Sequence, residues 1–294
     1  MNEIGFIGLG NMGNGMAENL LAKGSNLHVY TKTKHKMDSF VIKGARSHES
    51  IQSLSKECNI ILSCLPSVKI SKEVFLGPGG ILSSAKPGSI VVDHSTVDVE
   101  TSRLTWEKAL NKNIYFIDAP ISGGPVGAKE GTLTIMCGGD SIAFEKAKST
   151  FEKMGESVVH MGGSGTGTSM KLVNQLLTSV NTIAAMEAII LADKAGIELN
   201  SVIDVLSTSF GNSRMVERNM PIYIKKEFEN SSAPIRNIVK DLQIIVDLCS
   251  ELDIKLPLTD MSLDLFKNTN DLNINEPDLS AVSIFIENYQ ERQK

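Results

Sequence analysis

Short apolar runs alternate with amphipathic stretches up to about residue 160 of the chain. Several of these runs are apolar throughout, as strands of a parallel sheet are when helices cover both of its faces. Strands that alternate with helical patterns predict an α/β fold with a parallel sheet. The first helical pattern runs from Met12 to Lys23, and Gly24 is expected to follow its end. The predicted strands are Ile4–Ile7, Leu27–Thr31, Asn59–Cys64, Ser89–Asp93, Ile114–Asp118, Leu133–Cys137 and Val158–Met161.

The periodicity changes at Gly162-Gly163-Ser164-Gly165. Beyond this run the apolar residues recur at helical spacing, and no convincing strand pattern follows. The predicted helices are Met170–Ala195, Leu199–Thr208, Asn237–Leu252 and Leu279–Arg292, with turns at Gly196, Pro221, Pro234, Pro257 and Pro277. We therefore predict an α/β domain over residues 1–163 and an all-helical domain over residues 164–294.

The composition is that of an ordinary globular protein. The 294 residues are 41% apolar and 21% charged, and a single core of this size would be unusual. The net charge is −5, from 29 basic and 34 acidic side chains, which gives no general attraction to nucleic acid or to an anionic membrane. We expect neither as a partner.

Other features concern location and metals. The longest uncharged stretch, Leu172–Met186, contains several amides and hydroxyls, so we interpret it as a buried helix that is too short and too polar to cross a membrane. No signal peptide is evident, and Cys58, Cys64, Cys137 and Cys249 have no disulfide or metal spacing, so a cytoplasmic location is expected. We predict no metal site, because the five histidines are isolated in the sequence: His28, His35, His48, His94 and His160.

A glycine fingerprint follows the first predicted strand and opens the first predicted helix. Its residues are Gly8, Leu9, Gly10, Asn11, Met12 and Gly13. In this context the glycines permit a tight turn, and the backbone N–H groups at the helix start favour a pyrophosphate. The alternative is a glycine-rich turn without a ligand. We predict a Rossmann-type dinucleotide-binding domain.

The end of the second predicted strand bears on the choice of cofactor. NAD-specific domains usually have an acidic residue there, but this chain has none between Asn19 and Met37. It has Thr31, Lys32 and Thr33 instead, with Lys34 next. Hydroxyls and lysines suit a 2′-phosphate, so NADP is predicted, with NAD as the alternative cofactor. A solvated, lysine-rich helix start is the other interpretation.

Two further segments carry chemistry. After the strand that ends at Asp118, Ser122, Gly123 and Gly124 offer a hydroxyl and unobstructed backbone N–H groups that can bind a small carboxylate, although a purely structural loop is equally consistent. Lys171 lies in an almost wholly apolar helix, and Asn174 and Gln175 share its face. A lysine withdrawn from water at a domain boundary can exchange a proton with an alcohol or carbonyl. The alternative is an exposed helix lysine.

These motifs, in this order, resemble the β-hydroxyacid dehydrogenase family along essentially the whole chain, including its 3-hydroxyisobutyrate dehydrogenases. The similar segments are Gly5–Leu20, Asp118–Gly124, Gly165–Gln175 and Lys240–Leu242. The resemblance implies NAD(P)-dependent hydride transfer with Lys171 as general acid/base. It implies substrate binding by Ser122, Gly123, Gly124, Asn174 and Gln175. Dinucleotide contacts are implied for Leu65, Pro66, Thr96 and Lys240. Members of the family generally form homodimers or homotetramers.

One departure leaves the substrate open. The family usually has Asn four residues after the lysine, where this chain has Gln175. Together with the run from Gly211 to Met215, this glutamine is similar to members that act on sugar acids such as threonate. The strand end at Thr31–Thr33 is similar to members that reduce glyoxylate or succinic semialdehyde. A small 3-hydroxy acid is the first expectation, and a cofactor-binding scaffold without turnover is the alternative of another class.

Overall fold

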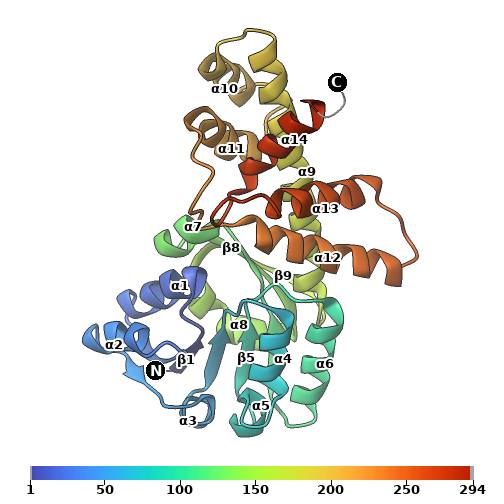
Figure 1. Ribbon diagram of the computed structural model, residues 1–294. Helices are drawn as coiled ribbons and strands as arrows, with labels where there is room; N and C mark the ends of the chain where they lie inside the picture. The colour runs from blue at the N-terminus through green and yellow to red at the C-terminus, as the bar shows by residue number, and fades with distance from the viewer. Residues whose placement is uncertain (1, 292–294) are drawn as a thin grey trace. The chain divides into compact units, whose positions relative to one another are not determined.

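The computed structural model describes residues 2–291 (Figure 1). The chain divides into two compact units, Met1–Lys171 and Leu172–Lys294, while the domain boundary near residue 163 stays a prediction. The first unit is an α/β domain of the Rossmann type and the second is helical, as the sequence predicts.

One sheet forms the centre of the first unit, and its strand order is β3-β2-β1-β4-β5-β6-β8-β7, with β9 also paired to β8. The order reverses between β1 and β4, the kind of position at which open α/β sheets bind their ligands. All seven predicted strands are present, and two short strands, β3 and β7, were missed. The strands are β1 (Glu3–Ile7), β2 (Asn26–Tyr30), β3 (Arg46–Ser47), β4 (Ile60–Ser63), β5 (Ile90–Asp93), β6 (Tyr115–Asp118), β7 (Ile121–Ser122), β8 (Leu133–Gly139) and β9 (Gly155–Gly162).

The prediction of a parallel sheet is wrong at one end. β1 to β6 are parallel, but β8 runs antiparallel to both β6 and β7. An apolar run does not reveal strand direction, because a strand covered on both faces has the same composition in either direction.

Helices cover both faces of the sheet (Figure 1). Adjacent residues of one strand belong to different core layers: Leu62 lies in the cluster that includes Leu20 and Phe151, whereas Ile61 lies in the cluster that includes Phe75. This arrangement explains why the strands are apolar throughout. The helices are α1 (Asn11–Ala22), α2 (Lys34–Ile42), α3 (Ile51–Glu57), α4 (Val68–Leu76), α5 (Ile81–Ser84), α6 (Val99–Leu110), α7 (Gly124–Glu130) and α8 (Ser141–Phe151). Gly24 follows α1 with φ +76°, as predicted for a residue that ends a helix.

The second unit contains helices and turns, and within residues 172–291 the structure has no strand beyond one isolated bridge. The helices are α9 (Thr166–Lys194), which begins in the first unit, α10 (Leu199–Ser207), α11 (Arg214–Lys225), α12 (Ile235–Glu251), α13 (Pro257–Asn270), the 3-10 helix η1 (Leu279–Ala281) and α14 (Val282–Glu291). Arg292, the expected end of the last helix, lies outside the described residues.

Two turn predictions are wrong. Pro221 lies inside α11. The burial of Val216, Met220 and Tyr223 compensates for the loss of the backbone hydrogen bond that a proline cannot donate. Pro257 is the first residue of α13, a position that suits proline because the N–H it lacks would have no helical partner there.

The helix that was predicted to be buried over Leu172–Met186 is only partly buried in the single chain. Val173, Leu177 and Leu191 are each more than half exposed. Among the described residues, α9 is the one helix long and apolar enough to cross a membrane by length and composition alone. Core helices of soluble proteins pass the same test, so this finding is weak evidence for a membrane span.

Candidate active site

The loop after β1 has the conformation that a dinucleotide-binding turn requires. Gly8 has φ +97°, and a Cβ there would lie 2.4 Å from the carbonyl oxygen of Cys64. A Cβ on Gly13 would lie 2.0 Å from the Gly8 carbonyl oxygen, so this glycine permits close packing of α1 on the turn. A Cβ on Gly10 would meet no protein atom within 4 Å. Nothing in the protein therefore requires Gly10 to lack a side chain, whereas an approaching pyrophosphate does.

α1 is joined to α7, the helix that follows the Ser122 segment. A Cβ on Gly15 would lie 2.8 Å from the backbone of Ala128, and the two helices therefore touch through their main chains. The Nδ2 of Asn19 donates to the carbonyl oxygens of Ala128 and Lys129 at 2.9 and 3.0 Å. Asn19 was not predicted to have a role, although it lies in the family-like segment Gly5–Leu20.

The end of β2 places hydroxyl and ammonium groups near the glycine turn. Thr33 is the N-cap residue of α2, and its side chain makes no capping hydrogen bond. Lys32 is exposed, and Thr31 is half-buried. The Nζ of Lys36 donates to the carbonyl oxygen of Leu9 at 3.1 Å, which brings a positive charge to the turn itself. Lys36 belongs to the same lysine-rich stretch that the sequence predicts to favour a 2′-phosphate.

The segments after β4 and β5 are tied together at the same edge of the sheet. The backbone N–H of Leu65 donates to Ser95 Oγ at 2.8 Å, and the N–H of Ser95 donates to Asp93 Oδ1 at 2.9 Å. Asp93 also accepts from the hydroxyls of Ser63 and Ser71. This buried network fixes the loops that contain Pro66 and Thr96, the residues expected to contact the dinucleotide.

The Ser122 segment is a strand end followed by a left-handed turn, not a simple loop. Ser122 pairs with Thr134 at the antiparallel edge of β8. Gly123 and Gly124 have φ values of +135° and +64°, which disfavour any residue with a side chain. Both glycines are exposed, and a Cβ on Gly124 would meet nothing within 4 Å. Their backbone N–H groups are therefore accessible to a small anion.

The first turn of α9 is held by Asp118, whose carboxylate is 1% exposed. Its Oδ1 accepts from the N–H of Gly165 at 2.7 Å, and its Oδ2 accepts from the N–H of Thr168 at 2.8 Å. Burial raises the pKa of Asp118, and the two N–H donors oppose that rise. α9 begins four residues earlier than predicted because this cap comes from a strand distant in sequence.

Lys171 lies on α9 in the second turn, and only 7% of it is exposed. The interpretation of Lys171 as an ordinary exposed helix lysine is therefore wrong. A buried ammonium group is rare, because removing the charge from water is costly unless a partner compensates it.

The second unit holds a polar network of its own. Gln175 Nε2 donates to Asp241 Oδ2 at 2.6 Å, and Gln175 Oε1 accepts from Asn174 Nδ2 at 3.1 Å. Lys240 forms an ion pair with Asp241 Oδ1 at 2.7 Å. Three expected site residues, Asn174, Gln175 and Lys240, are thus brought together by a buried carboxylate that was not predicted to take part.

The run from Gly211 to Met215 has structural roles. The Oγ of Ser213 accepts from the N–H of Val216 and caps α11. Asn212 Nδ2 donates to Glu217 Oε1 at 2.8 Å. These contacts within the protein account for Asn212 and Ser213 without a role in binding a sugar acid.

Three of the four cysteines are poor candidates for a nucleophile. Burial raises the pKa of the Cys58, Cys64 and Cys137 thiols to about 12, so they stay protonated at neutral pH.

The histidines are not all isolated, contrary to expectation, because His28 and His48 contact each other at 2.8 Å. Strand pairing brings them together, and sequence spacing does not reveal it.

Comparison with known families agrees with both units. Residues 3–163 match the NAD-binding domain of 6-phosphogluconate dehydrogenase, and residues 165–285 match the NAD-binding region of NADP-dependent 3-hydroxyisobutyrate dehydrogenase. The chain belongs to the β-hydroxyacid dehydrogenase family. It is an NAD(P)-dependent oxidoreductase that acts on hydroxyl or carbonyl groups.

Individual relatives cover nearly the whole chain. A 2-(hydroxymethyl)glutarate dehydrogenase of Eubacterium barkeri is 34% identical over 95% of this chain and 93% of its own length. A 2-hydroxy-3-oxopropionate reductase of Escherichia coli is 36% identical over 90% of each chain. A solved structure of Mycobacterium tuberculosis 3-hydroxyisobutyrate dehydrogenase with L-serine has a TM-score of 0.88 at 27% identity, over 97% of this chain and 99% of that one.

Proposed function

We propose that this β-hydroxyacid dehydrogenase is an NADP(H)-linked enzyme that interconverts small 3-hydroxy acids and their semialdehydes. The observation that carries the proposal is a buried lysine, Lys171, on the helix that Asp118 anchors to the same sheet as the glycine turn. A passive nucleotide binder has no need of a buried ammonium group at this place.

The glycine turn fits a dinucleotide, because Gly10 leaves a space that no protein atom fills and α1 directs backbone N–H groups toward it. Asn11 and Met12 begin α1 and are part of this turn. When bound, the nicotinamide supplies the carbon that accepts or releases the hydride. Leu65, Pro66 and Thr96 would border the same nucleotide from the ends of β4 and β5.

Lys171 is assigned the proton. In the oxidation, the hydrogen on the carbinol carbon leaves as hydride, with both electrons of the C–H bond. The hydroxyl proton passes to the neutral amine of Lys171, and the C–O bond becomes a carbonyl. In the reduction, the ammonium of Lys171 returns a proton to the carbonyl oxygen as that oxygen gains charge. Such a positioned acid/base contributes roughly 10²- to 10⁴-fold to the rate.

The carboxylate end of the substrate is assigned to the Ser122 segment. Ser122 offers a hydroxyl, and the exposed Gly123 and Gly124 offer backbone N–H groups beside no side chain of their own. Asn174 and Gln175 would contact the polar groups near the reacting carbon.

The substrate class follows from chemistry that the relatives' names share. In all three substrates the reacting carbon is bonded directly to the carbon that carries a carboxylate. These substrates are 2-(hydroxymethyl)glutarate, 3-hydroxyisobutyrate and 2-hydroxy-3-oxopropionate. Because Gln175 stands where the family usually has Asn, acids with an additional hydroxyl, such as threonate, are the second candidate substrates.

NADP(H) is assigned as the cofactor from the charges at the end of β2. Thr31, Lys32 and Thr33 bring hydroxyls and a cation, and Lys36 adds a second cation 3.1 Å from the Leu9 carbonyl. No carboxylate between Asn19 and Met37 opposes a 2′-phosphate.

Exposed apolar residues on one face of α9, Val173, Leu177 and Leu191, support a homodimer or homotetramer. Light scattering during gel filtration measures the molar mass directly. A cytoplasmic location remains part of the proposal.

A substrate screen tests the proposed function. Small 3-hydroxy acids, their semialdehydes, threonate and glyoxylate are offered with NADP(H) and with NAD(H), and the absorbance of the reduced nicotinamide is followed. Turnover of a 3-hydroxy acid or semialdehyde that is faster with the phosphorylated cofactor supports the proposal. Nicotinamide binding without turnover of any of these acids would contradict it and favour a scaffold.

A further inference from the structure

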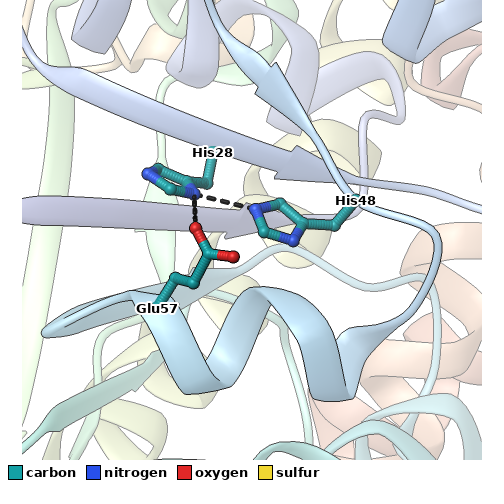
Figure 2. A group of neighbouring side chains, drawn as sticks. All are labelled: His28, His48 and Glu57. Atoms are coloured by element: carbon teal, nitrogen blue, oxygen red, sulfur yellow. Dashed lines mark hydrogen bonds and ion pairs between the residues drawn. The ribbon is translucent and has the colours of Figure 1, made fainter.

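Two histidines and a glutamate meet at the edge of the sheet in the first unit (Figure 2). His28 lies on β2, His48 directly follows β3, and Glu57 is the last residue of α3. His28 Nδ1 is 2.8 Å from His48 Nε2 and 3.8 Å from Glu57 Oε2. One donor atom from each of the three residues lies within 4.8 Å of the others. None of the three has a part in the proposed reaction.

The outer nitrogen of each imidazole faces an acceptor. His28 Nε2 lies 2.8 Å from Glu3 Oε2, and a carboxylate only accepts, so this nitrogen carries the proton. His48 Nδ1 lies 3.1 Å from Ser53 Oγ. The Ser53 hydroxyl donates its own proton to the Ser50 carbonyl oxygen at 2.9 Å, so His48 Nδ1 is the donor in this contact.

These partners leave two lone pairs facing each other. With both outer nitrogens protonated, neutral His28 and His48 present Nδ1 and Nε2 as acceptors, 2.8 Å apart. Glu57 adds a carboxylate oxygen on the same side (Figure 2). Three electron-rich atoms at these distances repel one another unless a cation or a shared proton lies among them.

We propose that His28, His48 and Glu57 form a binding site for a divalent transition-metal ion, of which Zn²⁺ is the representative. The ligands are His28 Nδ1, His48 Nε2 and a carboxylate oxygen of Glu57. Imidazole nitrogen and carboxylate oxygen are a ligand set that zinc favours. Zinc at about 2.1 Å from each nitrogen requires the two nitrogens to separate to roughly 3.4 Å, a small movement from the observed distance.

The surroundings suit a metal ligand set. Glu3 and Ser53 hold the outer nitrogens, as outer-shell acceptors do for metal-bound histidines. An open cavity of about 660 Å³ is lined by His48 and Glu57, so water could supply the fourth ligand from this side. Arg46 also lines this cavity, but Glu49, Glu57 and the nearby Glu3 outweigh its charge.

The metal would connect β2, the segment after β3 and α3 within the first unit. β2 ends at Tyr30, directly before the proposed 2′-phosphate residues, so the ion would also stiffen the strand that presents them. The proposal does not depend on the function proposed above, and its tests measure metal binding and stability instead of turnover.

Titration calorimetry of tag-free, chelator-treated protein with Zn²⁺ tests the site. We expect one zinc per chain and a rise in Tm of several degrees with zinc in excess over Kd. His48→Ala and Glu57→Gln should each weaken binding about tenfold or more. Glu57 is more than half exposed, so Glu57→Gln should change the free energy of unfolding little, and this variant still tests the site if the histidine variant is unstable.

The matched control is His35→Ala, which removes an exposed imidazole from α2 and should leave zinc affinity unchanged. Co²⁺ should give the intense visible absorption of tetrahedral coordination in the wild type and lose it in Glu57→Gln. Mg²⁺, which prefers six oxygen ligands, should not compete. Absence of stoichiometric zinc binding would show that the imidazoles share a proton instead. Zinc binding that His48→Ala and Glu57→Gln both leave intact would equally overturn the proposal.

Discussion

Gln175 donates a 2.6 Å hydrogen bond to Asp241, so a buried carboxylate fixes the amide at the position where the family usually has Asn. The other end of the amide accepts from Asn174, and Asp241 is paired with Lys240. The additional methylene of Gln is therefore used to reach Asp241. The departure from the family pattern is supported by a network around it.

Gln175→Asn should change the choice of substrate. The shorter side chain cannot hold the bond to Asp241 and keep its amide in the same place. We expect KM for the preferred acid to rise about tenfold, the equivalent of one lost hydrogen bond, and the ratio of kcat/KM for polyhydroxylated against alkyl-substituted acids to shift. Gln243→Asn, which shortens an amide bound to Asp247 and Lys267 in the same unit, is the control. Equal kinetics for both variants would contradict the assignment.

Lys171→Ala should remove turnover and keep cofactor binding. The buried amine is the proposed proton carrier, so kcat should fall about 10³-fold. The Kd for NADPH, measured by its fluorescence, should change less than about threefold, since no binding role is assigned to Lys171. Lys194→Ala, at the exposed end of the same helix, should behave as the wild type. Substantial kcat in Lys171→Ala would refute the acid/base role.

Lys32→Ala should weaken NADPH more than NADH. Lys32 is exposed, so its attraction for a 2′-phosphate is partly screened, and a loss of about fivefold in NADPH affinity at low salt is expected. The effect should shrink as salt is added. Lys112→Ala removes an exposed charge beyond α6 and controls for net charge. A loss shared equally by NADPH and NADH would exclude Lys32 as a 2′-phosphate ligand.

Local patterns predicted much of the fold. Each predicted strand is present because a short apolar run between turn residues is typical of a buried strand in a parallel α/β sheet. The glycine turn was equally predictable, since Gly8, Gly10 and Gly13 have a recognisable spacing within six consecutive residues, although the carbonyl that excludes a side chain at Gly8 belongs to the distant Cys64. Gly24 ends α1 for a reason that is also local.

Contacts between distant residues could not be predicted in this way. Asp118 caps α9 from 47 and 50 residues away, and Asp241 holds Gln175 from 66 residues away. His28 and His48 meet only because β2 and β3 pair. Pro221 was taken as a turn because its local preference is strong, and the buried face of α11 outweighs that preference.

Gly167→Ala should destabilise the protein, although alanine is the better helix former by about 1 kcal/mol. A Cβ on Gly167 would lie 2.3 Å from the carbonyl oxygen of Met136 and 2.5 Å from that of Asp118, so α9 would be pushed off the sheet. We expect a loss of about 2 kcal/mol in the free energy of unfolding. Chemical denaturation measures it.

The control for this prediction lies four residues away. A Cβ on Gly163 would meet nothing within 4 Å, so Gly163→Ala should leave stability nearly unchanged. Equal stability of the two variants would show that the start of α9 does not need the close approach that Gly167 provides.

His94 should make the protein less stable in acid. Burial lowers the pKa of His94 to about 4, and its Nδ1–H donates to the Ala119 carbonyl oxygen at 2.7 Å. Between the unfolded pKa near 6.5 and the folded value, the unfolded state binds the extra proton. The stability that His94 contributes is therefore complete above pH 6.5 and lost as the pH falls toward 4, which amounts to about 3 kcal/mol.

His94→Asn isolates this contribution, because an amide Nδ2 can donate to Ala119 without titrating. The variant starts less stable at pH 7, since the smaller side chain leaves a cavity. Its free energy of unfolding should nevertheless fall less than that of the wild type between pH 7 and pH 4. NMR of the ring provides a direct check, as His94 should remain neutral at pH 5.5 in the folded protein. The same acid loss in both proteins would mean that other groups control the acid limit, and an imidazolium at pH 5.5 would mean that burial does not hold His94 neutral.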